Sequence, residues 1–199
     1  MGTTTWLMVG AAVLVVAMFV MSKVGVGNTN LPKWRALAAM VNGTASISGL
    51  KGTYDGRAVE SRISSGGGNA RGPSAGNWDY EIKLNTGSTG QGQNWQIFHY
   101  EGEWRSDPAG QALKDQMQSG PASSLLEQAG FQKLVYKSKS GELVGTSSHV
   151  IQAGLSDSLS DISKTISNQP VPTSDQFKAQ LDLLAWIAKQ QPSAPMQNH

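Results

Sequence analysis

The chain has 199 residues, with 16 Lys and Arg against 14 Asp and Glu, no Cys and a formal net charge of +2. A balanced charge gives no basic surface for nucleic acid, so no nucleic-acid partner is expected. The lack of Cys excludes disulfides, thiolate metal sites, iron–sulfur clusters and haem attachment through C-x-x-C-H. It leaves the cellular compartment open, since Cys-free domains occur on both sides of a bacterial membrane.

The longest apolar stretch runs from Trp6 to Met21 and has no charged, amide or hydroxyl side chain. A helix over residues 1–26 is long enough to cross a hydrocarbon core of roughly 30 Å. Trp6 would lie at one interface, Phe19 inside the bilayer, and Lys23 among the headgroups of the other side. The alternative is a cleaved signal peptide, which needs a preceding basic residue, a shorter apolar run and a small-residue cleavage site. None of these is present, so we expect an uncleaved transmembrane anchor.

Positive charges near this stretch predict its orientation. Lys23, Lys33 and Arg35 follow it, whereas only the α-amino group precedes it. Because Lys and Arg side chains resist translocation, the N-terminus is expected outside and the rest of the chain in the cytoplasm. The sequence therefore predicts a single-pass protein of the bacterial inner membrane with a cytoplasmic soluble domain.

Residues 27–43 have the pattern of a juxtamembrane amphipathic helix. Pro32 suits its first turn, and Asn42-Gly43 provides a left-handed stop. The apolar face consists of Trp34, Leu37, Ala38 and Val41. Two placements stay open: Trp34 and Arg35 contact the headgroup layer, or the helix packs on its own domain.

Residues 44–191 predict one α+β domain, a mostly antiparallel sheet packed with a few helices. A hairpin is expected over Thr44–Ser64, because Asp55-Gly56 is a favoured pair for a tight turn. Ala45, Ile47 and Gly49 alternate with polar residues in its first strand. The clearest strand is Trp78–Asn85, in which Trp78, Tyr80, Ile82 and Leu84 fall on one face.

The segment Asn94–Tyr100 predicts a strand with apolar residues on both faces. Trp95, Ile97 and His99 lie on one face, with Phe98 and Tyr100 on the other. A central strand covered on both sides is the commoner explanation. The alternative is that Phe98 and Tyr100 contact a partner protein.

Further elements follow towards the C-terminus. The expected order is a helix from Asp107-Pro108 through Met117, a helix over Ala122–Ala129, strands over Phe131–Lys137 and Glu142–Thr146 with a possible extension over His149–Gln152, a helix over 155–166, a last helix over residues 173–189, and a tail over 192–199. In the last helix, Thr173 and Gln176 match a capping box. Its apolar stripe is Phe177, Leu181, Leu184 and Ile187 or Ala188.

No catalytic, metal or cofactor motif is recognised. His99 and His149 are the candidate bases, but His99 continues an apolar strand face, where a buried structural histidine is expected. Ser148 adjoins His149 in sequence, yet neighbours in a strand point to opposite faces. Residues 64–77 are rich in Gly, although the Lys-Ser or Lys-Thr ending of a phosphate-binding loop is missing. We expect no enzyme and no cofactor, and hold an anchored hydrolase as the third hypothesis.

Three stretches carry a resemblance: GTYDGRAV at Gly52–Val59, WDYEIKL at Trp78–Leu84 and the segment Pro172–Ala188. They resemble a set of uncharacterised bacterial membrane-anchored proteins with a G-x-Y-x-G-R opening and a closing F-x-x-Q-L-x-L-L helix. This resemblance implies no activity. The layout of one N-terminal span and a β-containing cytoplasmic domain is also similar to the H subunit of photosynthetic reaction centres, which caps the pigment-binding subunits, although no motif of that subunit is present.

Together these patterns predict a non-enzymatic accessory subunit of a larger membrane protein complex. Its expected partners are the lipid bilayer and integral-membrane subunits, with an energy-transducing complex, photosynthetic or respiratory, as the expected class. The alternative is a membrane-anchored binding module that holds a peptide, glycan or lipid. Such a module would use Trp78, Trp95 or Trp104 as a stacking surface.

Overall fold

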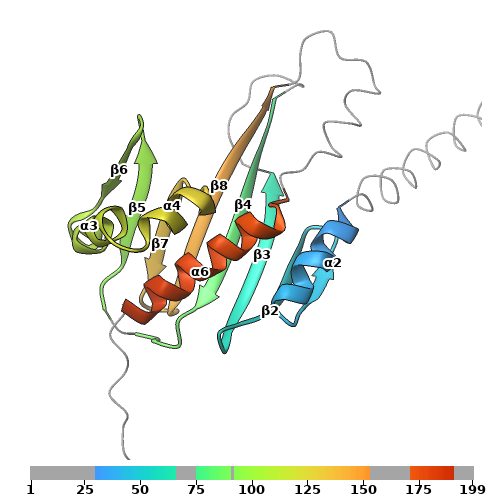
Figure 1. The fold of residues 1–199 in the computed structure, drawn as a ribbon, viewed down its shortest axis with the longest axis horizontal. Helices are drawn as coiled ribbons and strands as arrows, with labels where there is room; N and C mark the ends of the chain where they lie inside the picture. Colours follow the sequence, from blue (N-terminus) through green and yellow to red (C-terminus); the bar gives the residue numbers. More distant parts are fainter. Residues whose placement is uncertain (1–29, 66–74, 91, 153–170, 191–199) are drawn as a thin grey trace, which may run out of the picture.

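The computed structural model of the chain describes residues 30–65, 75–90, 92–152 and 171–190. They form one antiparallel sheet of eight strands in the order β1-β2-β3-β4-β8-β7-β5-β6. Figure 1 shows the helices α2, α3, α4 and α6 gathered on one face of this sheet. The predicted α+β class with an antiparallel sheet is confirmed. Across these residues no helix is long and apolar enough to cross a membrane. The predicted anchor at 1–26, the helix at 155–166 and the tail at 192–199 lie outside them.

The elements have the following bounds: α2 Leu31–Met40, β1 Thr44–Ser46, β2 Gly49–Tyr54, β3 Arg57–Ser65, β4 Ala75–Asn85, β5 Trp95–Tyr100, β6 Glu103–Ser106, the 3-10 turn η1 Pro108–Gly110, α3 Gln111–Ser119, α4 Ser123–Ala129, β7 Lys133–Lys137, β8 Glu142–Gln152 and α6 Ser174–Gln190. All neighbouring strands pair antiparallel.

Helix α2 packs against its own domain. Pro32 lies in its first turn, and Asn42 after its end has φ 47°, as the stop signal predicts. Trp34 is 0% exposed and its ring stacks on Tyr80 of β4 with 6.2 Å between centroids. Trp34 therefore offers no surface to lipid or to a partner, and its expected contact with the headgroup layer is wrong. Arg35 is exposed, so its contact with the headgroup layer stays a prediction.

The first two hairpins differ in how well the sequence predicts them. Asp55 and Gly56 take φ 49° and 73° in the β2–β3 turn, which confirms the Asp-Gly prediction. However, the expected first strand is broken by a second turn, Ile47-Ser48, between β1 and β2. Ile47 is 54% exposed rather than part of the buried face. Periodicity failed here because a two-residue turn continues the alternation of polar and apolar residues.

The centre of the sheet is formed by β3, β4 and β8, and it confirms the predicted strand face. Tyr80, Ile82 and Leu84 of β4 are buried under the helices. Gly145 of β8 pairs with Ile82 and leaves room for the ring of Phe131, since a Cβ there would lie 2.4 Å from a ring carbon. The register is therefore fixed by one buried face and by a close contact that only Gly permits.

Strand β5 lies between β7 and the edge strand β6. Its residues Trp95 and Ile97 are buried, as predicted. His99 is exposed, so the expected buried histidine is wrong. Phe98 is half-buried and Tyr100 is 53% exposed. The expectation of a strand covered on both sides is also wrong, because the helices cover only one face.

Helix α6 runs across the middle of the covered face (Figure 1). The Thr173 hydroxyl accepts a hydrogen bond from the Gln176 N–H at 3.2 Å, which is half of the predicted capping box. The Gln176 side chain does not complete the box. Instead, the side-chain amides of Gln176 and Gln180 both donate to the carbonyl of Ala129, at 3.5 and 2.9 Å. This satisfies the end of α4 and binds it to α6.

The residues that point away from the helices form what we call the open face. Cross-strand pairing places on it Lys51, Glu60, Arg62, Glu81, Lys83, Val144, Val135, Phe98, Tyr100 and Arg105. No helix among the residues described above covers this face. It is therefore available for contacts with another molecule.

Candidate interaction surfaces

Ion pairs cover the half of the open face formed by β2, β3 and β4. The Lys51 ammonium lies 3.2 Å from the Glu60 carboxylate on the neighbouring strand. The Glu81 carboxylate lies 3.1 Å from Arg62 and 3.3 Å from Lys83. Pairs of this kind at a surface contribute about 0–1 kcal/mol each to stability. Their main consequence is a polar surface of alternating charge.

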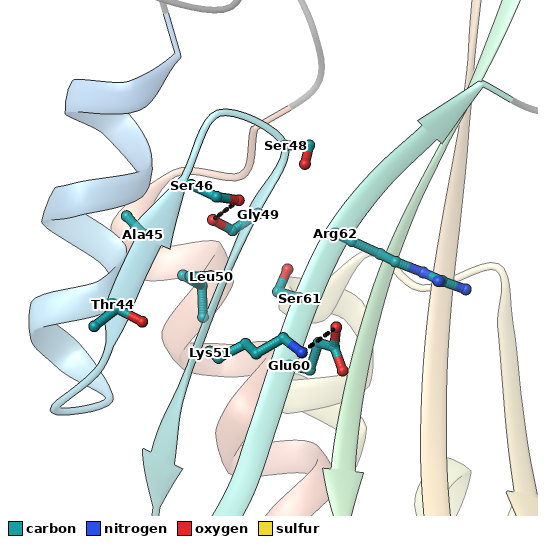
Figure 2. Close-up of a pocket in the computed structure, with 10 residues that line it drawn as sticks. All are labelled: Thr44, Ala45, Ser46, Ser48, Gly49, Leu50, Lys51, Glu60, Ser61 and Arg62. Atoms are coloured by element: carbon teal, nitrogen blue, oxygen red, sulfur yellow. Dashed lines mark hydrogen bonds and ion pairs between the residues drawn. The ribbon is translucent and has the colours of Figure 1, made fainter.

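A hollow of about 330 Å³ opens over β1, β2 and β3 (Figure 2). Its lining comprises Thr44, Ala45, Ser46, Ser48, Gly49, Leu50, Lys51, Glu60, Ser61 and Arg62. Figure 2 shows Lys51 and Glu60 meeting at its lower edge and Arg62 reaching towards β4. Its charged groups are already paired within the sheet. In the described ranges no group of three or more His, Cys, Asp or Glu could hold a metal ion.

The other half of the open face carries an aromatic patch, which we define as Phe98, Tyr100 and Arg105. Phe98 of β5 pairs directly with Arg105 of β6, so the three side chains share one face of the hairpin. The Arg105 guanidinium lies 5.0 Å from the centre of the Tyr100 ring, within cation–π distance. The same guanidinium lies 3.5 Å from the Glu101 carboxylate, so the patch presents a large aromatic ring beside an ion-paired arginine.

A third feature joins α6 to the β2–β3 turn. Tyr54 donates a hydrogen bond of 2.5 Å to Asp182, and the Lys178 ammonium lies 2.6 Å from the second oxygen of the same carboxylate. Beside this pair lies a hollow of about 350 Å³ lined by Tyr54, Asp55, Asp182, Ala185, Trp186 and Lys189, which we call the Trp186 hollow. Aromatic and charged side chains thus meet at one end of α6.

The electrostatics of this cluster follow from its contacts. Burial raises the pKa of Tyr54 to about 12, helped by the hydrogen bond to Asp182. Burial alone would raise the pKa of Asp182, but the hydrogen bonds from Lys178 and Tyr54 lower it below its usual value. The hydrogen bond and charge of Lys189 lower the pKa of Asp55. At neutral pH the cluster therefore holds a neutral tyrosine between two ionised carboxylates.

The structure unites only part of the predicted contact set. Phe98 and Tyr100 lie together in the aromatic patch. Trp34 is buried, and the exposed Arg35 lies on α2 at the other end of the strand order. The predicted bilayer contacts Trp6, Phe19 and Lys23 fall outside the described residues.

The tryptophans expected to form a groove do not share one. Trp95 is in the core, stacked on Tyr136 with 6.0 Å between centroids. Trp104 is half-buried and meets His99 edge-on at 5.3 Å. Trp78 pairs with His149 across β4 and β8, but the side chains of both lie outside what the structure describes. The hypothesis of a groove using Trp95 is therefore wrong.

Sequence reasoning missed two surface residues. Trp186 is half-buried on α6 and lies off the predicted apolar stripe, and that position is a signal that a helical projection can find. Arg105 had no comparable signal, because its contact with Tyr100 depends on the hairpin register.

Comparisons of the chain with protein-family models, curated proteins and solved structures find no match. The resemblance to membrane-anchored bacterial proteins therefore stays a prediction.

Proposed function

We propose that this protein is a non-enzymatic accessory subunit of a larger membrane protein complex. Its N-terminal stretch would serve as a single transmembrane anchor, and its α+β domain would bind an integral-membrane partner through the open face. An energy-transducing complex stays the proposed class. The cytoplasmic location of the domain likewise stays a proposal, resting on Lys23, Lys33 and Arg35.

The observation that carries this proposal is the aromatic patch. Tyr100 is one of two large apolar side chains that are more than half exposed in the described ranges. Tyrosine and arginine are enriched where protein interfaces concentrate their binding energy, because both combine a large contact area with directional polar groups. Neither Phe98 nor Tyr100 is needed to fill the core, which lies on the other face.

The apolar stretch at Trp6–Met21 provides the second line of support. An uncleaved span keeps the domain at the membrane, which raises the effective concentration of any membrane partner without a large interface. A modest patch of three side chains is then sufficient to orient the domain on that partner.

Site-specific photocrosslinking in native membranes would test this. A photoreactive phenylalanine analogue in place of Tyr100 should give a crosslink to an integral-membrane protein. Gln128 of α4, exposed on the helix-covered side, is the matched control position and should give none. The crosslinked partner, tagged in turn, should recover the unmodified chain in mild detergent. Equal crosslinking at both positions, or at neither, would contradict the proposed use of the aromatic patch.

A second candidate function, a membrane-anchored binding module, is favoured by the Trp186 hollow. There a tryptophan, a tyrosine and a carboxylate share one lining, a combination that suits stacking and hydrogen bonding of a sugar ring or polar peptide. Soaking with a glycan library should then produce binding that Trp186→Ala abolishes and Tyr100→Ala leaves intact.

A further inference from the structure

The β1–β2 turn and the start of α2 lie at the same end of the domain. Helix α2 rises about 15 Å over its ten residues. The chain then reverses, and the three residues of β1 climb back by about 10 Å alongside it. Ile47 therefore lies within about one helical turn of the level of Leu31. Figure 2 shows this arrangement, with Ser48 towards the end where α2 begins.

The length of chain between the predicted anchor and α2 limits how far this end can lie from a bilayer. The anchor is predicted to end at Val26, and the described structure begins at Asn30. Four residues span at most about 14 Å even when fully extended. Because Trp34 fixes α2 to the core, this limit applies to the whole domain and to the β1–β2 turn.

One of the two turn residues, Ile47, is unusual for a turn, whereas Ser48 is a common turn residue. Two-residue turns favour Gly, Asn, Asp, Pro or Ser, because these residues suit the backbone geometry or bond it locally. Ile47 has none of these properties and is 54% exposed. Its apolar side chain is therefore available for a contact outside the domain.

The basic side chains at this end have no acidic partner among the residues that the structure describes. Lys33 and Arg35 are exposed, and α2 has no acidic residue in its first turn. Within the described ranges neither side chain has an acidic partner, in contrast to the paired Lys51, Arg62 and Lys83 of the open face. Unpaired basic side chains close to a membrane are attracted by the phosphates of anionic lipids.

We infer that this end of the domain, formed by Ile47, Lys33 and Arg35, docks on the anionic surface of the same bilayer that holds the N-terminal stretch. The inference rests on the proposed anchor. It assigns the bilayer contact to the β1–β2 turn and the exposed side of α2, instead of the buried Trp34 face. The domain would then stand on the membrane with its strands running away from it.

The test uses the full chain reconstituted in vesicles of phosphatidylcholine and phosphatidylglycerol. The chain has no Cys, so Ile47→Cys and Thr53→Cys can each carry a single fluorophore. Both positions are exposed, and Thr53 lies about 13 Å along β2 from Gly49, towards the far end of that strand from the turn that holds Ile47. A nitroxide on the lipid headgroup should quench the label at Ile47→Cys strongly and the label at Thr53→Cys weakly.

A third label, at Val15→Cys, distinguishes a failure of the docking inference from a failure of the proposed anchor. If a quencher in the acyl chains reaches Val15→Cys while Ile47→Cys behaves like Thr53→Cys, the docking inference is overturned and the anchor stands. If Val15→Cys is also unquenched, the anchor is absent and the proposed function fails with it. No partner protein is present, so quenching at Ile47→Cys reports the bilayer alone.

The role of charge has its own readout. Lys33→Gln combined with Arg35→Gln should shift the ratio of docked to undocked domain by about 25-fold towards undocked, since each basic residue contributes about a fivefold attraction. Quenching at Ile47→Cys should fall accordingly in this double variant. It should also fall for the chain with native Lys33 and Arg35 in vesicles of phosphatidylcholine alone. Unchanged quenching in both would overturn the assignment of Lys33 and Arg35 to an anionic surface.

Discussion

Trp34 of α2 stacks on Tyr80 of β4 with 6.2 Å between the ring centroids and 20° between the ring planes. Both rings are buried, at 0% and 1% exposed. This contact joins the first described helix to the central part of the sheet. Any orientation that the membrane imposes on the start of α2 is therefore transmitted to the whole domain.

Replacing Trp34 tests the strength of this connection. Trp34→Ala should lower the free energy of unfolding by about 3–5 kcal/mol, because a large buried ring is lost and leaves a cavity. Lys33→Ala, one residue earlier and exposed, should change it by less than about 0.5 kcal/mol. Denaturant titration of both variants in detergent measures the difference. A loss for Trp34→Ala as small as that for Lys33→Ala would mean that α2 is not part of the core.

Gly52 tests a close approach between the start of the domain and β2. A Cβ at this position would lie 2.4 Å from the carbonyl oxygen of Val41 and 2.6 Å from its side chain. Gly52→Ala should therefore lower the unfolding free energy by about 1–3 kcal/mol through strain. Thr53→Ala, at the exposed neighbouring position, is the matched control and should be nearly neutral. A neutral Gly52→Ala in thermal unfolding would refute this packing.

Gln180 tests the connection between α6 and α4. Its side chain is fully buried and donates a hydrogen bond of 2.9 Å to the carbonyl of Ala129. Gln180→Ala should cost about 1–3 kcal/mol, because the carbonyl loses a buried partner. Gln176→Ala should cost less, since that side chain is half-buried and 3.5 Å from the same oxygen. The reverse order in denaturant titrations would show that Gln176 is the main partner.

The raised pKa of Tyr54 predicts how the free energy of unfolding changes at alkaline pH. The pKa of Tyr54 is raised to about 12 in the folded protein from an ordinary value of 10.0. An unfolded tyrosine releases its proton at pH 10, whereas the folded one holds it, so folding loses stability as the pH rises from 10 to 12. Tyr54→Phe removes this loss but keeps the ring. The decline in unfolding free energy over that range should be smaller in the variant. Parallel declines in both proteins would contradict the raised pKa.

Asp182, the partner of Tyr54, contributes stability that depends on pH in the opposite direction. The pKa of Asp182 is lowered in the folded protein, so its contribution is present above the ordinary value of 3.8 and is lost as the pH falls below it. Asp182→Asn, measured beside Tyr54→Phe in the same titrations, should lose this acid dependence. An unchanged acid midpoint would show that Asp182 is not stabilised by Lys178 and Tyr54.

The sequence predicted best those parts of the fold in which a position requires one residue type for one physical reason. The stretch Gly52–Val59 is an example, because Gly52 admits Val41, Tyr54 binds Asp182, and Gly56 takes φ 73° in the turn. The closing helix is another, since Phe177, Leu181, Leu183 and Leu184 are all 0% exposed. These residues thus have roles in the fold, and the same two stretches also supply Tyr54, Asp55, Asp182, Ala185 and Trp186 to the Trp186 hollow.

The parts that failed depend on contacts between distant segments. His99 continues an apolar alternation, yet it is exposed near the end of β5. Ile47 continues the alternation of a strand, but the chain turns there, and β2 folds back antiparallel to β1. The aromatic patch was half predicted: the exposed aromatics Phe98 and Tyr100 were expected, and Arg105 required the hairpin register.

The most direct test of the central claim is the mass of the native assembly. The chain, tagged after His199 and extracted from its own membranes in a mild detergent, would be examined by native mass spectrometry. The account predicts a defined complex in which this chain and at least one integral-membrane protein occur in a fixed ratio, and it predicts that Tyr100→Ala weakens that complex. Recovery of the native chain alone, monodisperse and stable, would contradict the account.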